Sequence, residues 1–309
     1  MRDTILYGDC IASLKQFDEQ ARMCVTSPPY YGLRNYGDED EQIGQEDTPE
    51  QFIDNLVKVF REVRNVLTDD GTCWVNLGDS YYNYRPGRGQ GLVKQTVSNT
   101  KQDLPDLCPR RGNKLDGLKE KDLIGIPWMF AFAMRADGWY LRQDIIWHKP
   151  NPMPESVKDR CTKSHEYIFL FSKNKKYYYD NEAIKEPAKD WGTRDRTNGK
   201  YHNEGTGLSP HTGLSKSYPT KNKRSVWSVT NKPYKGAHFA VYPPDLIEPC
   251  ILAGSEKGDI VLDPFMGSGT TAMVAKKNSR AYLGCELNKD YASLISDRLS
   301  TIPNKLPLY

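Results

Sequence analysis

Short apolar runs alternate along this chain with longer segments in which apolar residues recur every three or four positions. The short runs, typical of buried strands, are Thr4–Tyr7, Met23–Thr26, Thr72–Asn76, Gln143–Trp147, Tyr167–Phe171, Ile260–Leu262 and Ala281–Cys285. The helix-like segments are Pro49–Leu67, Ile124–Ala136, Pro244–Ala253, Thr270–Lys277 and Lys289–Leu299. This alternation predicts βαβ units and a doubly wound, mostly parallel α/β sheet with helices on both faces.

Composition narrows the class of protein. The 309 residues can form one large domain or one domain with an insertion. No apolar run approaches the roughly 20 residues that cross a bilayer, and the segment Met1–Thr4 does not resemble a signal peptide. The seven cysteines include no CxxC pair, which favours reduced thiols and argues against a zinc site. We therefore expect a cytoplasmic protein with no membrane association and no metal.

Two long regions, 85–120 and 190–235, are polar and lack the periodicity of packed elements. Charge is concentrated around the second one: residues 173–235 hold fourteen Lys and Arg against six Asp and Glu, a net charge of +8, whereas the whole chain carries +3. A basic segment on an otherwise acidic body indicates a polyanionic partner. The alternative is a solvated, flexible insertion.

The sequence DIVLDPFMGSGTT at 259–271 predicts a strand, a tight glycine turn and the start of a helix. The next strand ends on Glu286, and an acid in that position binds ribose hydroxyls in folds of this kind. Thr270 stands where a triphosphate-binding loop needs lysine. Asp263 would repel a pyrophosphate but suits a sulfonium, so the turn favours S-adenosylmethionine. The alternative is a purely structural turn.

The sequence TSPPY at 26–30 ends the second predicted strand. Two prolines cannot donate to a sheet ladder, so the strand must stop before them. The carboxyl end of a strand in an open α/β sheet is the usual place for a ligand. The alternative interpretation is a rigid turn that carries a surface tyrosine.

Taken in order, these motifs resemble the β-group of DNA amino-methyltransferases. The similarity covers most of the chain outside the two polar regions and includes LYGDC at 6–10, WVNLGDSY at 74–81, DIIWHKPNPMP at 144–154, HEYIFLFSK at 165–173, HFAVYPPDLIEPCILAGS at 238–255 and LGCELNKDY at 283–291. The resemblance implies a seven-stranded, Rossmann-like methyltransferase fold that is circularly permuted. It also implies S-adenosylmethionine as methyl donor and double-stranded DNA as substrate.

The resemblance further implies a set of residues that bind the donor. Four residues of the glycine turn, Asp263, Phe265, Gly267 and Gly269, would hold its methionine moiety. Glu286 would accept its ribose hydroxyls, Asp9 would meet its adenine amine, and Cys10 and Leu287 belong to the same donor-binding set. A segment before the fourth predicted helix would cover the donor. The glycine-turn residues are Asp263, Pro264, Phe265, Gly267, Ser268, Gly269 and Thr270, and the covering residues are His238, Phe239, Ala240 and Tyr242. Asp9 has an alternative interpretation as the N-cap of a short helix at Ile11–Phe17.

The catalytic residues expected from the resemblance are Ser27, Pro28, Pro29 and Tyr30. The Ser27 hydroxyl and the Pro28 carbonyl can accept the hydrogens of an exocyclic amine, and Tyr30 can stack on a base that has been swung out of the duplex. Family members with serine in this motif mostly act on cytosine N4, and those with aspartate on adenine N6. We therefore predict a site-specific cytosine-N4 methyltransferase, with adenine N6 as the alternative.

The expected organisation is a catalytic half at 1–172 with a basic insertion at about 85–120, a target-recognition region at 173–235, and a donor-binding half at 236–309. Predicted DNA-binding residues are Arg194, Arg196, Lys221, Lys223 and Arg224. Any restriction endonuclease partner would be a separate chain, and the protein would be a monomer or a homodimer. Two other functions remain open: an RNA or small-molecule methyltransferase, and a DNA-binding module without catalysis.

Overall fold

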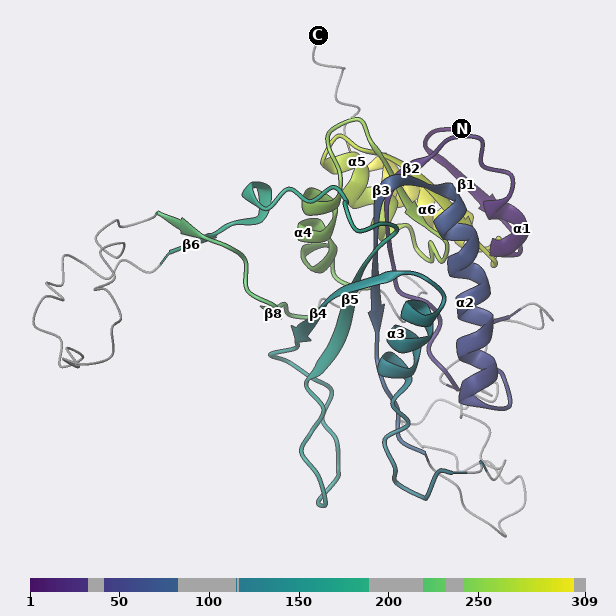
Figure 1. Ribbon diagram of the computed structural model, residues 1–309, viewed down its shortest axis with the longest axis vertical. Helices are drawn as coiled ribbons and strands as arrows, with labels where there is room; N and C mark the ends of the chain where they lie inside the picture. The colour runs from purple at the N-terminus through teal and green to yellow at the C-terminus, as the bar shows by residue number, and fades with distance from the viewer. Residues whose placement is uncertain (33–41, 83–114, 116, 189–218, 232–241, 303–309) are drawn as a thin grey trace, which may run out of the picture.

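The computed structural model describes residues 1–32, 42–82, 115, 117–188, 219–231 and 242–302. Most of both polar regions therefore lies outside the described residues. The described part forms one mixed sheet flanked by helices (Figure 1). In spatial order its strands are β1 (Thr4–Tyr7), β10 (Ala281–Glu286), β9 (Ile260–Asp263), β2 (Ala21–Thr26), β3 (Leu67–Leu77), β5 (His165–Ser172), β4 (Tyr140–His148) and β8 (Val226–Ser228).

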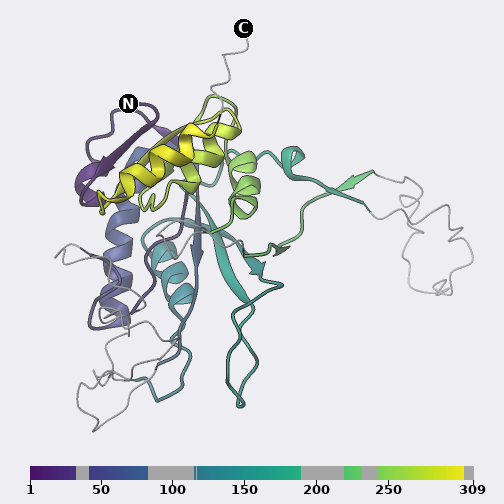
Figure 2. The ribbon, with the colours of Figure 1, turned by 180° about the vertical axis from the view of Figure 1, so that it is seen from behind.

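The predicted doubly wound architecture is confirmed, with one difference in strand number. All seven predicted strands are present, and the described sheet has an eighth, β8, which pairs in parallel with β4 at the edge. This three-residue strand lies within the basic segment, where no run of apolar residues marks it. A separate two-stranded ribbon, β6 (Glu186–Pro187) with β7 (Thr220–Lys221), extends away from the sheet (Figures 1 and 2).

Helices cover both faces of the sheet (Figures 1 and 2). One apolar core joins it to α1 (Cys10–Leu14), α2 (Pro49–Val66) and α3 (Ile126–Ala136), and a second joins it to α4 (Pro244–Gly254), α5 (Thr270–Lys277) and α6 (Tyr291–Ser300). Strand residues alternate between these cores: Cys24 packs into the first and Val25 into the second. Within the described residues, no helix is both long and apolar enough to span a membrane.

Helix α2 illustrates how local sequence sets an element. Thr48 caps it by accepting a hydrogen bond from the Gln51 amide at 3.2 Å, and Pro49 occupies the first turn, where no amide donor is needed. Its buried side chains recur at helical spacing and face the sheet; they are Phe52, Ile53, Leu56, Val57, Val59, Phe60, Val63 and Val66.

The two ends of the chain meet in the sheet. Strand β1 pairs in parallel with β10, with Thr4 opposite Leu283 and Tyr7 opposite Glu286. The unit β9–α5–β10 near the carboxyl terminus is therefore completed by the amino-terminal strand. This is the order expected of a circularly permuted Rossmann-like fold.

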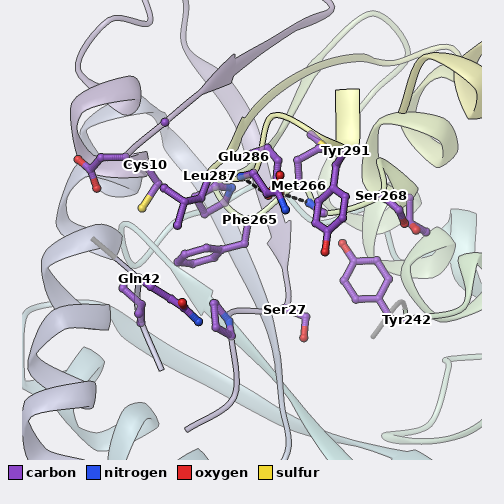
Figure 3. Close-up of a pocket in the computed structure, with 18 residues that line it drawn as sticks. Cys10, Ser27, Gln42, Tyr242, Phe265, Met266, Ser268, Glu286, Leu287 and Tyr291 are labelled. Carbon is purple, nitrogen blue, oxygen red and sulfur yellow. Dashed lines mark hydrogen bonds between the residues drawn. The ribbon is translucent and has the colours of Figure 1, made fainter. Parts of the chain in front are cut away.

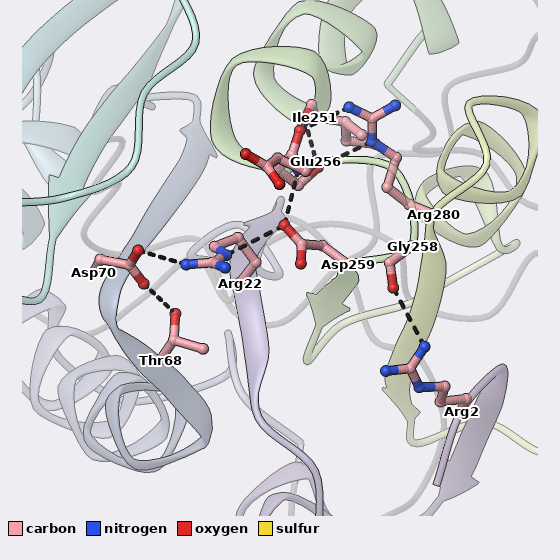
Figure 4. A network of polar contacts seen from close by, with 10 residues as sticks. Arg2, Arg22, Thr68, Asp70, Ile251, Glu256, Gly258, Asp259 and Arg280 are labelled. Atoms are coloured by element: carbon pink, nitrogen blue, oxygen red, sulfur yellow. Dashed lines mark hydrogen bonds and ion pairs between the residues drawn. The ribbon is translucent and has the colours of Figure 1, made fainter.

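The seam between β2 and β9 joins the amino-terminal half of the chain to this carboxyl-terminal unit. Only two pairs of residues are in register along these two described strands, Met23 with Val261 and Cys24 with Leu262. At the amino end of the seam, the Arg22 guanidinium contacts Asp70 and donates from Nε to Asp259 Oδ2 at 3.2 Å (Figure 4).

The carboxyl end of the same seam is closed by a buried hydrogen bond. Thr26 Oγ1 donates to Asp263 Oδ1 at 2.6 Å, and the two side chains are 0% and 1% exposed. Thr26 and Asp263 are separated by 237 positions in the sequence. Their bond therefore places the next residues, Ser27 and Pro264, side by side at the start of two loops.

Replacing Thr26 by valine should destabilise the fold. The change keeps the branched shape and removes one donor to a buried carboxylate, so we expect the free energy of unfolding to fall by about 1–3 kcal/mol. Urea denaturation followed by circular dichroism measures the effect. Thr4→Val is the matched control, because that hydroxyl bonds the Arg2 carbonyl at an exposed position and should change stability by no more than about 0.5 kcal/mol. Equal midpoints for the two variants would contradict this account of the seam.

Candidate active site

A pocket opens at the carboxyl ends of β1, β2, β9 and β10, which all run parallel. The pocket is open to solvent on one side. The segments that follow these four strands form its wall, together with Tyr242 and Tyr291 (Figure 3). The lining residues are Gly8, Asp9, Cys10, Ser27, Pro29, Gln42, Ile43, Tyr242, Pro264, Phe265, Met266, Gly267, Ser268, Thr270, Glu286, Leu287, Asn288 and Tyr291.

The glycine turn forms one wall of this pocket. Gly267 and Gly269 both have positive φ, 55° and 79°, which other residues rarely adopt. A Cβ on Gly269 would also lie 3.1 Å from Cγ2 of Ile295 in α6. Glycine is thus required there both for the backbone conformation and for close packing of a helix behind the turn.

Glu286 holds the turn against the end of β10. Its Oε2 accepts a hydrogen bond from the Gly267 amide at 2.6 Å, and its Oε1 accepts one from the Asn288 amide at 2.9 Å. Burial raises the pKa of this carboxyl from 4.5 to about 7, although both backbone donors favour the charged form. Each oxygen retains a second lone pair, so the carboxylate can still accept from hydroxyl groups in the pocket.

Asp263 does not line the pocket, contrary to the sequence-based expectation that it would contact the ligand. Its two oxygens accept hydrogen bonds from Thr26, Thr271, Tyr242 and the Phe265 amide. Burial raises its pKa above the usual value while these four donors act in the opposite direction. The aspartate therefore fixes the strand ends and the turn around the pocket.

Asp9 both caps a helix and lines the pocket. Its Oδ2 accepts from the Ala12 amide at 2.7 Å and so caps α1, as the alternative interpretation predicted. The same residue lines the pocket, together with its neighbours Gly8 and Cys10.

The TSPPY loop supplies the wall opposite the glycine turn. Ser27 and Pro29 line the pocket, whereas Pro28 and Tyr30 are absent from its lining. Ser27 Oγ donates to Asn76 Oδ1 at 3.4 Å. The Tyr30 hydroxyl donates to Glu166 Oε2 at 2.7 Å, and a Cβ on Gly78 would lie 2.6 Å from the Tyr30 ring. The ring therefore packs directly on the Gly78 backbone.

Several residues that the sequence analysis assigned to donor or DNA binding are not among those that line the pocket. Gly269 belongs to the turn but does not line the pocket. Predicted cover residues His238, Phe239 and Ala240 lie outside the described residues, as do Arg194 and Arg196. Lys223 and Arg224 both pair with Glu186, at 3.7 Å and 3.2 Å, and Lys221 lies in the β6–β7 ribbon.

The pocket also contains residues that the sequence analysis did not single out. Met266, Asn288 and Tyr291 follow predicted site residues within a few positions, so proximity in sequence was a usable signal. Gln42 and Ile43 had no such signal, because only the folded chain brings them to the pocket. All the missed lining residues are Gly8, Gln42, Ile43, Met266, Asn288 and Tyr291.

Electrostatics restrict what this pocket can bind. None of the described lining residues is a lysine or arginine, whereas Asp9 and Glu286 supply carboxylates. A ligand rich in phosphate would meet no cationic side chain from these lining residues. A nucleoside that carries a positive group and free hydroxyls suits this donor and acceptor set. Among the described residues, no group of His, Cys, Asp and Glu side chains is arranged to hold a metal ion.

The chain is similar to known DNA methyltransferases in both sequence and structure. Residues 21–297 match the family described as DNA methylase. The Type II methyltransferase M.XycI of Xanthomonas campestris pv. cyanopsidis is 47% identical over 297 residues, covering 96% of this chain and 87% of the relative. M.Cfr9I of Citrobacter freundii is 46% identical with the same coverage. Among solved structures, the cytosine-N4-specific PvuII DNA methyltransferase superposes with a TM-score of 0.63 at 18% identity, covering 99% of this chain and 88% of that one, which supports the fold.

Replacing Glu286 by glutamine should remove part of the pH dependence of stability. Because the pKa of Glu286 is raised in the folded state, its contribution is fully present below about pH 4.5 and is lost as the pH rises through about 7. The stability of the wild type relative to Glu286→Gln should thus fall by up to about 3 kcal/mol between pH 4.5 and 8. Urea unfolding of the ligand-free proteins across this range measures it. A constant difference would show that Glu286 does not titrate as described.

Proposed function

The chain belongs to the DNA methylase family, and we propose that it methylates the exocyclic N4 amine of cytosine in duplex DNA. One observation carries this proposal: Ser27 and the glycine turn at 267–269, which are far apart in sequence, border a single pocket. A methyl donor held by the turn and an amine held at Ser27 would therefore be neighbours. S-adenosylmethionine is the methyl donor.

The residues of the pocket fit this cofactor. Glu286 would accept the ribose hydroxyls, and the side chains of Phe265 and Ile43 supply apolar surface that suits an adenine ring. The acidic lining and the lack of cationic side chains among the described lining residues suit a sulfonium. When bound, the cofactor supplies an electrophilic methyl group.

Ser27 and Pro28 would prepare the amine. The nitrogen of an exocyclic amine is a poor nucleophile because its lone pair is delocalised into the base. The Ser27 hydroxyl and the Pro28 carbonyl would accept its two hydrogens and draw the nitrogen toward a tetrahedral geometry. The double proline makes this loop rigid, so little freedom is lost when the base binds. A strong general base is not needed, since the methylated amine releases its proton readily.

Tyr30 would support the target base after it leaves the duplex stack. Two contacts already fix the plane of its ring: the hydroxyl is held by Glu166, and the ring edge packs against Gly78. A ring whose orientation is already fixed at both ends can stack on a base with little further loss of side-chain entropy. Extrusion of the base is part of this proposal because an amine inside the stack cannot reach the pocket.

Cytosine N4 is preferred over adenine N6 for two reasons. The acceptor in the motif is Ser27, and the structurally similar PvuII enzyme is cytosine-N4-specific. Adenine N6 remains the second candidate, since a serine can also accept from that amine. Because both close relatives are Type II methyltransferases, we further propose a restriction-modification setting with the endonuclease on a separate chain.

We assign DNA contact to the basic region 173–235, the proposed target-recognition region. In its described part, Arg224 is well exposed, with 73% of its side chain accessible, and Lys221 lies on the projecting ribbon. Lys223 is less accessible, with 21% of its side chain exposed, and its ammonium lies 5.0 Å from the centre of the Trp227 ring. Arg224 and Lys221 are therefore the better candidates for phosphate contacts.

Product analysis tests the proposed reaction. The purified protein is incubated with unmethylated duplex DNA and S-adenosylmethionine, and the DNA is digested to nucleosides that are identified by mass. We expect N4-methyldeoxycytidine. A digest containing only N6-methyldeoxyadenosine would overturn the choice of base, and methyl transfer to RNA or free nucleosides but not to duplex DNA would overturn the substrate class.

Replacing Ser27 by alanine should separate chemistry from binding. We expect turnover to fall by about 100-fold, because the amine then has one acceptor instead of two, while the Kd for duplex DNA stays within about threefold. Single-turnover methyl transfer and fluorescence anisotropy measure the two quantities. If Ser27→Ala retains full turnover, the hydroxyl is not an acceptor for the amine.

Neutralising Lys221 and Arg224 together should weaken DNA binding and reduce its salt dependence. The slope of log affinity against log salt should become shallower by about 0.9 for each phosphate that the protein no longer neutralises. Lys223→Gln should have a smaller effect, and Lys277→Gln, in helix α5 away from the basic region, serves as the control. An unchanged slope for the Lys221 and Arg224 double variant would remove these residues from the DNA interface.

A further inference from the structure

The proposed function requires Ser27 to act as a hydrogen-bond acceptor, which raises the question of its own proton. A serine hydroxyl carries one proton and two lone pairs. If the proton points toward the target amine, it meets the amine hydrogens and one acceptor site is lost. A nearby group that takes this proton keeps it away from the amine and leaves the oxygen as an acceptor.

Asn76 is in the right place to do so. It lies near the end of β3 and is 4% exposed. Its Oδ1 is 3.4 Å from Ser27 Oγ, and Ser27 is the donor of that contact. Hydrogen bonds around reacting groups are often long in the ligand-free state and shorten when the substrate binds.

The orientation of the Asn76 amide is dictated by its other neighbours. Its Nδ2 donates to the Tyr167 carbonyl at 3.1 Å and to Glu166 Oε2 at 3.3 Å. Both partners are acceptors, so they require the nitrogen on their side. A flipped amide would place an oxygen against two oxygens, so Oδ1 must face Ser27.

A competing donor to the same oxygen is satisfied elsewhere. The Tyr30 hydroxyl also lies 3.4 Å from Asn76 Oδ1, but it is only 2.7 Å from Glu166 Oε2. Its single proton is therefore donated to the Glu166 carboxylate. Lys149 contacts the other oxygen of Glu166, and this ion pair holds the carboxylate in place beside Tyr30 and Asn76.

We propose that Asn76 is a positioning residue that accepts the Ser27 proton and so leaves Ser27 Oγ to accept a hydrogen from the exocyclic amine of the target base. The inference rests on the proposed function. Glu166, Tyr167 and Lys149 act one step further away by locking the Asn76 amide. Asn76 itself touches neither the base nor the methyl donor in this account.

The test compares Asn76→Ala with Asn76→Leu, which keeps more of the side-chain volume, in single-turnover methyl transfer. We expect both variants to lower the rate by about 10- to 100-fold, because the Ser27 proton is no longer held away from the amine. The Kd values for duplex DNA and for S-adenosylmethionine should change less than about threefold, since neither ligand contacts Asn76. An unchanged rate in a folded variant would overturn the proposal.

Thr72→Val is the matched control for a general loss of stability. Thr72 is fully buried in the same strand, four positions before Asn76 and away from Ser27. Its hydroxyl accepts a hydrogen bond from Trp74 Nε1 at 3.2 Å. This variant should lose stability comparable to the Asn76 variants, as measured by urea unfolding, and keep the wild-type rate. If Thr72→Val slows methyl transfer as much as Asn76→Ala, the role of Asn76 is only structural and the proposal fails.

A double-mutant cycle with Ser27→Ala tests whether Asn76 acts through Ser27. Without the hydroxyl there is no proton to hold, so adding Asn76→Ala to Ser27→Ala should slow the reaction less than about threefold further. A further reduction as large as in wild type would overturn the proposal. Should Ser27→Ala be too slow to measure, the comparison of Asn76→Ala, Asn76→Leu and Thr72→Val decides alone. Failure of the proposed function itself is distinct, because then the wild-type protein transfers no methyl group to DNA.

Discussion

The hydrogen bond between Thr26 and Asp263 is the interaction on which the site depends. It joins the ends of β2 and β9, which share only two pairs in register, and it sets the starting points of two loops that come from opposite ends of the chain. A buried carboxylate is stable only when donors surround it, and Asp263 has four. The aspartate therefore ties the strand seam, the glycine turn and Tyr242 into one rigid unit, and the pocket lies directly above it.

A second polar cluster lies on the other side of Ser27. Hydrogen bonds link Glu166 of β5 to Asn76 of β3, to Tyr30 in the loop after β2 and to Lys149 just beyond β4. The Asp263 cluster immobilises the wall that would hold the methyl donor, and the Glu166 cluster immobilises the wall that would hold the base. Strand β2 connects them, because Thr26 belongs to the first cluster and Ser27 contacts the second. Two walls fixed to one strand keep a constant spacing, which a methyl transfer between their ligands requires.

The sequence predicted the architecture well because hydrophobic periodicity and glycine turns are local signals. All seven strands and the helix at 270–277 were found in this way, and Glu286 was placed at the pocket by its position at a strand end. Long-range pairing was not readable. Asn76 and Glu166 meet only because β3 and β5 run antiparallel with Asn76 opposite Ile168, and no local pattern encodes that register. The deep burial of Asp263 could not be predicted either, because it depends on side chains that are distant in sequence, such as Thr26 and Tyr242.

The surroundings of position 27 also bear on why it is a serine. Asn76 Oδ1 faces this side chain and cannot turn away, because its amide nitrogen is required by Tyr167 and Glu166. A hydroxyl is stabilised next to this oxygen because it can donate to it. An aspartate in the same place would set a carboxylate against a fixed carbonyl oxygen, with no proton between them. The cluster around Glu166 is thus matched to a side chain that donates on one face and accepts on the other, so residue 27 and residue 76 have to be understood as one functional pair.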